Sequence, residues 1–154
     1  MRSFKQFIAE STKKPKKNEY SKGMIAYHGT ARQFDSFDSK AARHDSTKAA
    51  NEIEGHFFTN DHMHASSYAS MAKKHAGAEG KARVITTRLN MDNPKDVTNE
   101  IAKHQKTGMS FGDAKRKAYA GVDRTKHDGV YHRGNSFNHA EYVPFHPSKI
   151  DIVK

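Results

Sequence analysis

Cysteine is absent from this 154-residue sequence. Its absence excludes disulfides, cysteine metal sites and a thiol nucleophile. Hydrophobic residues are also scarce, at 34% of the chain with a mean hydropathy of −0.96. No apolar run approaches the roughly 20 residues that a membrane-spanning helix needs, so we expect no membrane partner. The core must be small, built from short strands such as Val84–Leu89 and Tyr142–Phe145.

Several common site motifs are missing as well. The chain contains no P-loop, no GxGxxG, no GxSxG and no HExxH. His62 and His64, with His56 nearby, resemble a set of metal ligands. Residues i and i+2 of a helix face different ways, so we expect these histidines on a solvated face and predict no metal site.

Acidic residues are too few to balance the basic ones. Lys and Arg number 27 against 17 Asp and Glu, which gives a formal net charge of +10 and a pI near 9.7. Such a charge predicts attraction to nucleic acid, to an acidic protein or to an anionic cofactor, without choosing between them. Two basic stretches, Lys103–Lys106 and Lys115–Lys117, lack interleaved aromatic residues, and we expect them to be solvated surface. The alternative is that they contact phosphates.

In the body of the chain the expected strands outnumber the helices and cluster late, which predicts a single α+β domain rather than a doubly wound one. Asn60 or Asp61 is the expected N-cap of a helix over 62–75, which ends before Gly77. Val, Ile and Thr favour a strand over 83–89. The remaining expected elements are strands over 24–27, 56–59, 128–131, 141–145 and 150–153, and helices over 40–52, 95–104 and 110–120.

The N-terminus differs from the body. Residues 1–10 carry Phe4, Phe7 and Ile8 at helical spacing, and residues 11–22 form a lysine-rich linker around Pro15. The first segment is similar to the capsid-targeting peptides of internal head proteins in large tailed phages. That resemblance implies cleavage after Glu10, packaging in the phage head and a mature domain over 23–154. The alternative is an ordinary N-terminal arm.

Three motifs follow one another in the body. They are Tyr27-His28-Gly29-Thr30, then Gly55-His56-Phe57-Phe58-Thr59 with Tyr68 eleven residues after Phe57, then Glu141-Tyr142-Val143-Pro144-Phe145. The ordered set resembles the NAD-binding core of ADP-ribosyltransferases. The resemblance is to the His-Tyr-Glu branch, which includes diphtheria toxin and the poly(ADP-ribose) polymerases. It implies one small domain of two packed, mostly antiparallel sheets with flanking helices.

The resemblance also implies roles for individual residues toward NAD, which is a substrate here. His28 would hydrogen-bond the adenosine ribose, and Gly29 would grip the nicotinamide carboxamide through its backbone. Thr30 would add a contact near the adenosine. Phe57 and Tyr68 would sandwich the nicotinamide ring. Glu141 would bind the ribose 2′-hydroxyl and stabilise positive charge, so Glu141, His28 and Tyr68 are the predicted catalytic residues.

The sequence departs from the family pattern at two positions. Phe57 stands where the family usually has Tyr, so one ring hydroxyl is missing. His139 stands where the arginine-modifying branch has Glu or Gln. The second departure argues against an arginine acceptor and leaves the acceptor open.

The sequence therefore predicts a monomeric, NAD-dependent ADP-ribosyltransferase. It would sit among packaged DNA in the virion and then enter the host cytoplasm, where it would modify a host protein or nucleic acid. Two alternatives stay open: a non-enzymatic, basic, DNA-associated head protein, and a nuclease that uses His28 with a second histidine. Each site residue also has an ordinary structural interpretation, such as a charged strand edge for Glu141.

Overall fold

The computed structural model describes residues 19–32, 36–37, 56–75, 81–134 and 139–154. The expected N-terminal peptide, most of the linker and the expected helix over 40–52 lie outside the described residues. The described part of the chain includes Tyr20, whose hydroxyl donates to the carbonyls of Leu89 (3.2 Å) and Met91 (2.8 Å). The packed part of the chain thus includes Tyr20, which lies within the segment expected to be linker.

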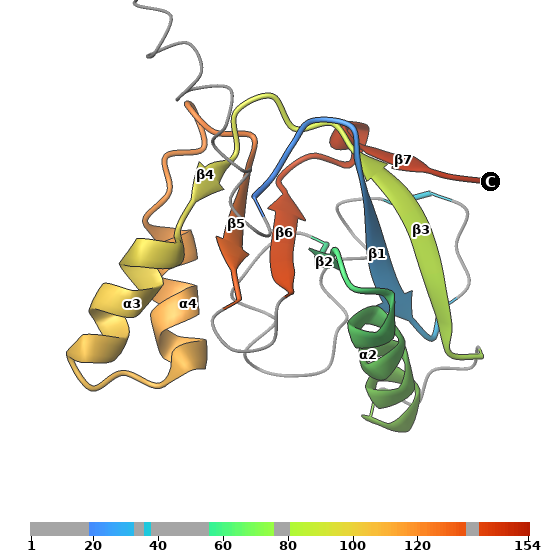
Figure 1. Cartoon of the computed structure of the whole chain (residues 1–154), viewed down its shortest axis with the longest axis horizontal. Coiled ribbons are helices and arrows are strands. Elements are labelled where there is room, and N and C mark those ends of the chain that lie inside the picture. The colour runs from blue at the N-terminus through green and yellow to red at the C-terminus, as the bar shows by residue number, and fades with distance from the viewer. Residues whose placement is uncertain (1–18, 33–35, 38–55, 76–80, 135–138) are drawn as a thin grey trace, which may run out of the picture.

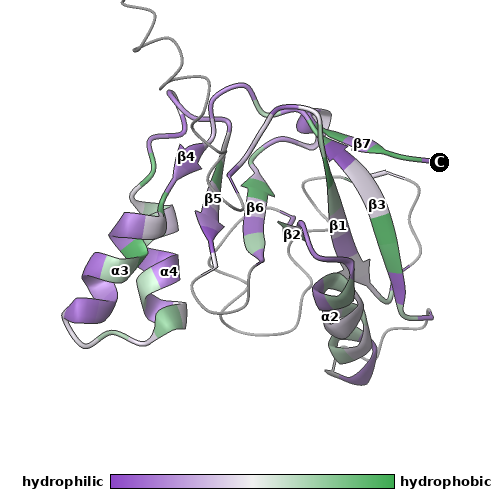
Figure 2. Cartoon of the chain, in the orientation of Figure 1, coloured by the Kyte–Doolittle hydropathy of each residue, from purple (hydrophilic) through white to green (hydrophobic). Residues whose placement is uncertain are grey.

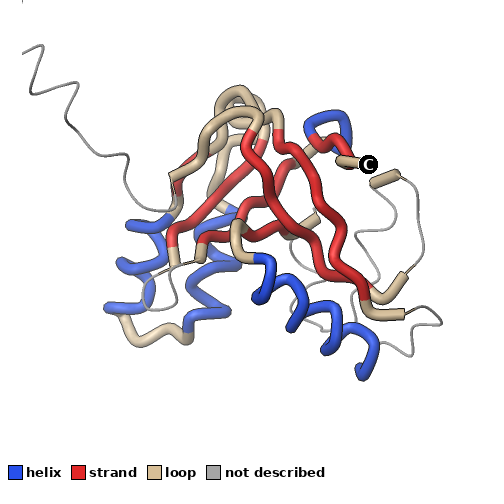
Figure 3. Tube along the Cα trace, turned by 45° about the vertical axis from the view of Figure 1, so that its right-hand side comes forward, coloured by secondary structure: helices blue, strands red, loops and turns tan. Residues whose placement is uncertain are grey.

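The described strands form one seven-stranded sheet in the order β4-β5-β6-β2-β1-β3-β7. All neighbouring strands are antiparallel except the parallel pair β4–β5. Figure 1 shows β1, β3 and β7 on one side and β4, β5 and β6 on the other, and the turned view in Figure 3 shows one curved layer. The strands are β1 (Met24–Thr30), β2 (Phe58–Thr59), β3 (Arg83–Leu89), β4 (Lys95–Asp96), β5 (Gly129–Arg133), β6 (Ala140–Pro144) and β7 (Ile150–Ile152).

The α+β class is confirmed, but the prediction of two packed sheets is wrong for the described strands. The two-residue strand β2 joins the halves. Thr59 pairs with Tyr27 of β1 on one side and with Glu141 of β6 on the other. Because β2 is so short, nothing in its local pattern distinguishes a bridge between two strands from the edge of a separate sheet.

The described part of the chain has three α-helices: α2 (His62–His75), α3 (Thr98–Lys106) and α4 (Phe111–Ala120). None of the described helices is long and apolar enough to span a membrane. Asp61 caps α2, since its Oδ1 accepts hydrogen bonds from the amides of Met63 (2.9 Å) and His64 (3.2 Å). Ser110 caps α4 by accepting from the Asp113 amide at 3.2 Å.

The start of α3 is the helix boundary that differs most from the expectation. The helix expected over 95–104 begins at Thr98, because Lys95 and Asp96 pair with β5 as strand β4. Asp96 Oδ1 accepts from the Thr98 amide (3.0 Å) and from the Thr98 hydroxyl (2.6 Å), which satisfies donors at the helix start.

The two faces of the sheet carry different apolar clusters, as expected from the alternation of side chains along each strand. Figure 2 shows hydrophobic (green) and hydrophilic (purple) residues mixed along the strands. One face carries Val130 and Val143, which pack with Val97, Ile101 and Ala114 of the α3–α4 region. The opposite face carries the larger cluster Ala26, Phe37, Phe58, Ile85, Leu89, Met91, Tyr131, Ala140, Tyr142 and Ile150.

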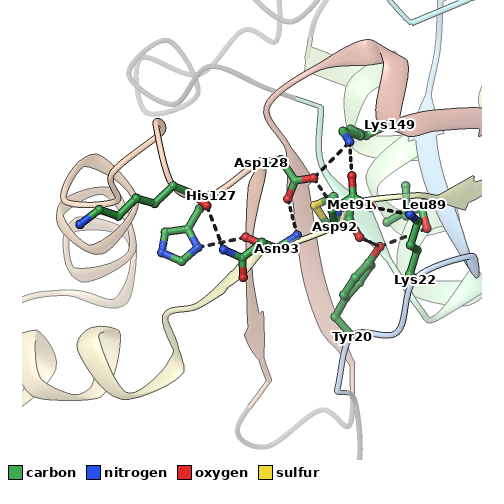
Figure 4. Close-up of polar contacts among 10 residues, drawn as sticks. Tyr20, Lys22, Leu89, Met91, Asp92, Asn93, His127, Asp128 and Lys149 are labelled. Carbon is green, nitrogen blue, oxygen red and sulfur yellow. Dashed lines mark hydrogen bonds and ion pairs between the residues drawn. The ribbon is translucent and has the colours of Figure 1, made fainter.

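A polar network fixes the turn between β3 and β4 (Figure 4). The Asp128 carboxylate accepts from the amides of Asp92 (2.6 Å) and Asn93 (3.0 Å). The Asp92 carboxylate in turn pairs with Lys22 (2.5 Å) and Lys149 (2.6 Å). Segments far apart in sequence are therefore tied together at the end of the sheet where β3 ends and β5 begins.

Candidate active site

Glu141 lies at the centre of the sheet, on the face that the helices cover. The strand register places Tyr27, Thr59, Glu141 and His132 in one row across β1, β2, β6 and β5. Directly paired residues share a face of the sheet, so these four side chains lie on one face. Glu141 and Tyr27 are two strands apart in this row, so their backbones are separated by roughly 10 Å.

Three side chains surround the Glu141 carboxylate, and we refer to the group of Glu141, Lys115, Tyr119 and His132 as the Glu141 cluster. Lys115 Nζ donates to Oε1 at 3.1 Å and to Oε2 at 3.3 Å. The Tyr119 hydroxyl donates to Oε1 at 2.8 Å. His132 Nε2 lies 3.7 Å from Oε1, too far for a hydrogen bond.

This surrounding keeps the Glu141 carboxyl ionised. Its side chain is only 12% exposed. Burial opposes ionisation, but the Lys115 ammonium, the His132 imidazole and the Tyr119 hydroxyl outweigh it and hold the pKa of Glu141 at about 2. At neutral pH the carboxylate therefore accepts hydrogen bonds and offers a negative charge, but has no proton to donate.

Phe57 and Tyr68 lie on the same side of the sheet as the Glu141 cluster. Lys115 Nζ is 5.4 Å from the centroid of the Phe57 ring. Tyr68 is 46% exposed on α2. Burial raises the pKa of its hydroxyl, and the Glu141 charge raises it further while Lys115 lowers it, so both charges are within electrostatic reach of the ring. The structure thus places Phe57 near the Lys115 ammonium that pairs with Glu141, and Tyr68 within electrostatic reach of both charges.

Gly29 and Thr30 end strand β1 beside α2. A Cβ added at Gly29 would lie 1.9 Å from the Ala65 carbonyl oxygen and 2.8 Å from the Ala69 amide nitrogen. Only glycine therefore permits α2 to approach β1 this closely. Thr30 is buried, and its hydroxyl accepts from the Arg32 amide at 3.1 Å.

The side chain of His28 lies on the opposite face from Glu141, because it is one residue from Tyr27 along β1. Its ring contacts Phe37 and Phe58 at centroid distances of 5.2 and 5.4 Å. Its Nδ1 lies 2.7 Å from the Phe57 carbonyl, which can only accept, so Nδ1 donates. His28 is thus tied to the Phe57 backbone but does not contact the Glu141 cluster.

Two histidines stack beside the site. The His64 ring of α2 lies 3.7 Å from the His139 ring, which precedes β6. Burial and the neighbouring His139 lower the pKa of His64, while Asp61 and Glu141 oppose the shift. His62 lies two residues earlier on α2 and contacts Tyr27. Within the described residues, no three His, Asp or Glu side chains converge on a position that could hold a metal ion.

A comparison with protein families identifies the family of the chain that carries this site. The model of the family described as ADP-ribosyltransferase in polyvalent proteins matches residues 18–151, which is most of the chain. The chain belongs to this family. No curated protein and no solved structure matches it significantly.

In this ADP-ribosyltransferase domain, three residues of the Glu141 cluster are not among the residues predicted for the site. Lys115 was expected to be solvated surface, and that expectation is wrong because its ammonium pairs with Glu141 and is 18% exposed. A signal was present: Phe111, Lys115 and Tyr119 recur every four residues on one face of α4. His132 gives no such signal, since only the pairing of β5 with β6 brings it opposite Glu141.

Proposed function

We propose that the domain transfers ADP-ribose from NAD to a macromolecular acceptor, with Glu141 as the catalytic carboxylate. The observation that supports this most is the ionised carboxylate in the middle of the sheet, in a chain whose family is ADP-ribosyltransferase. The reaction breaks the bond between nicotinamide and ribose, forms a bond from the ribose to the acceptor, and releases nicotinamide and one proton.

The carboxylate suits this chemistry because breaking a glycosidic bond of this kind builds positive charge on the ribose. A fixed negative charge at that point lowers the barrier, and such electrostatic contributions are typically about 3–4 kcal/mol. Nicotinamide is already a cationic leaving group, so the site needs no acid to protonate it. A carboxyl with a pKa of about 2 cannot act as an acid at neutral pH, which agrees with this mechanism.

The aromatic residues near Glu141 are the proposed nicotinamide site, as in the His-Tyr-Glu branch. Phe57 and Tyr68 would stack on the ring, which typically contributes about 0.5–1.5 kcal/mol beyond burial. Gly29 and Thr30 would contact the carboxamide and the adenosine side. The resemblance implies a contact from His28 to the adenosine ribose, but the His28 ring is buried on the face opposite Glu141. The proposed role of His28 is therefore to position Phe57 through its hydrogen bond to the Phe57 carbonyl.

The biological setting is a second part of the proposal. We propose a monomeric protein in the phage head that residues 1–10 target to the capsid, with residues 11–22 as a basic linker and residues 23–154 as the enzyme. The net charge of +10 would favour non-specific association with packaged DNA. After injection, the acceptor would be a host protein or nucleic acid. Mass spectrometry of purified virions should find a protein that begins at Ser11.

Labelling with NAD tests the enzymatic proposal. Host lysate is incubated with NAD labelled in the adenylate part, together with the wild type or with Glu141→Gln. Label should enter a macromolecule in the lysate with the wild type but not with Glu141→Gln. Protease or nuclease treatment of the labelled band then identifies the acceptor class. Equal labelling by both proteins would contradict the assignment of Glu141 as the catalytic carboxylate. Labelling by neither protein would contradict the enzymatic proposal and favour a basic DNA-associated protein without enzymatic activity.

A further inference from the structure

Lys115 covers the part of Glu141 that a substrate would need. Oε1 already accepts from the Tyr119 hydroxyl at 2.8 Å. Among the described residues, Lys115 donates a hydrogen bond to Oε2 from its Nζ, at 3.3 Å. A ribose hydroxyl that donates to Oε2 must therefore share this oxygen with the ammonium or displace it.

The ammonium also opposes the proposed chemistry. Within the described residues, Glu141 is the acid with which Lys115 forms an ion pair. A cation held against both carboxylate oxygens cancels much of the negative charge that should stabilise the ribose. It also lies beside the carbon on which positive charge develops. Catalysis therefore requires the ammonium to move or to be neutralised by another anion.

The surroundings of Lys115 allow such a movement. Its Nζ lies 5.4 Å from the centroid of Phe57 and 6.0 Å from that of Phe111. Phe111 is 41% exposed at the start of α4, so one of the two rings beside the ammonium borders solvent. A lysine ammonium on its four-carbon stem rotates easily and binds phosphate as a point charge. NAD brings two phosphates, whereas its nicotinamide riboside fragment carries the same glycosidic bond without any.

We propose that Lys115 is a positioning residue that occupies Glu141 in the free enzyme and moves onto a phosphate of the bound donor. The inference rests on the proposed NAD chemistry and adds to it a preference for donors that carry phosphate. A donor that carries phosphate uncovers Glu141, whereas a donor without phosphate leaves the carboxylate paired.

Two donors and three variants test this inference. Nicotinamide release is measured with NAD and with nicotinamide riboside, for the wild type, Lys115→Met, Lys115→Arg and Lys117→Met. Methionine keeps an unbranched stem between Phe57 and Phe111 but removes the charge. Lys117 is exposed two residues further along α4, so Lys117→Met is the matched control.

The expected result is a change of opposite sign for the two donors. Lys115→Met should raise kcat/KM for the riboside and lower it for NAD, each by about tenfold to a hundredfold, the range of a hydrogen bond to a charged group. Lys115→Arg should keep the wild-type preference for NAD, and Lys117→Met should change neither donor. Partial unfolding of a variant would lower kcat/KM for both donors by the same factor, so it cannot produce changes of opposite sign.

Two results would overturn the inference, and they are distinguishable from each other. If the wild type releases nicotinamide but Lys115→Met changes both donors by one factor or not at all, Lys115 is only a structural partner of Glu141. If the wild type releases nicotinamide from neither donor, the proposed enzymatic function fails and the inference fails with it.

Discussion

Replacing Glu141 by glutamine should make the stability of the protein less dependent on acid pH. Glutamine keeps the shape of the side chain and can still accept from Tyr119 and Lys115, but it does not titrate. The pKa of Glu141 falls from an ordinary value of 4.5 to about 2 in the folded protein, because its cationic and hydroxyl partners outweigh burial. Each pKa unit between the folded and unfolded states corresponds to about 1.4 kcal/mol.

The magnitude follows from this difference. Because the pKa is lower in the folded state, the contribution is fully present above the unfolded pKa of 4.5 and is lost as pH falls toward about 2. The total is about 3 kcal/mol, of which about 2 kcal/mol should be lost between about pH 7 and about pH 3. Asp92, Asp123 and Asp128 also have lowered pKa values, but both proteins share them, so the difference between the proteins isolates Glu141.

Urea unfolding at a series of pH values measures the effect. The free energy of unfolding of the wild type should fall more steeply on acidification than that of Glu141→Gln, by about 2 kcal/mol at about pH 3. Glu100→Gln is the matched control, at an exposed position on α3, and should keep the wild-type slope. Parallel curves for the wild type and Glu141→Gln would refute the account of an ionised, clustered carboxylate.

Three further changes probe other parts of the structure. Gly29→Ala should lower the free energy of unfolding by about 1–3 kcal/mol, because the new methyl group meets the α2 backbone; an unchanged urea midpoint would contradict that close approach. Asp128→Ala should lower the free energy of unfolding by about 1–3 kcal/mol, because the hydrogen bonds to two turn amides are lost. In the same urea assay, Asp151→Ala on the edge strand β7 should lower the free energy of unfolding less. Phe57→Leu should raise KM for NAD by about two- to tenfold through lost stacking, and an unchanged KM in a folded variant would remove Phe57 from the nicotinamide site.

Much of the described fold could be predicted from local sequence patterns. The helix over 62–75 and the strand over 83–89 agree with the structure in both bounds, because a polar cap and a run of β-branched residues mark them. The single sheet could not be predicted, since it depends on a strand of two residues, Phe58 and Thr59, which both pair with β6 while Thr59 alone also pairs with β1. The start of α3 was also missed, because the pairing of Lys95 and Asp96 with β5 is a tertiary contact.

The candidate site was only partly predictable, for a related reason. The sequence indicated Glu141, Phe57 and Tyr68, which the fold brings to one side of the sheet. It did not indicate that His28 points to the other face, since that depends on the register of β1 against β2. The ion pair from Lys115 depends on α4 lying close enough to β6 for its side chains to reach Glu141, a contact between residues 26 apart in sequence.

Nicotinamide release from NAD by the purified protein tests the central claim most directly. The wild type should release nicotinamide, and Glu141→Gln should lower the rate by about a hundredfold or more, in line with the loss of about 3–4 kcal/mol of electrostatic stabilisation. Calorimetry should show that Glu141→Gln still binds NAD. Near-normal release by a folded, NAD-binding Glu141→Gln protein would contradict the assignment of Glu141 as the catalytic carboxylate.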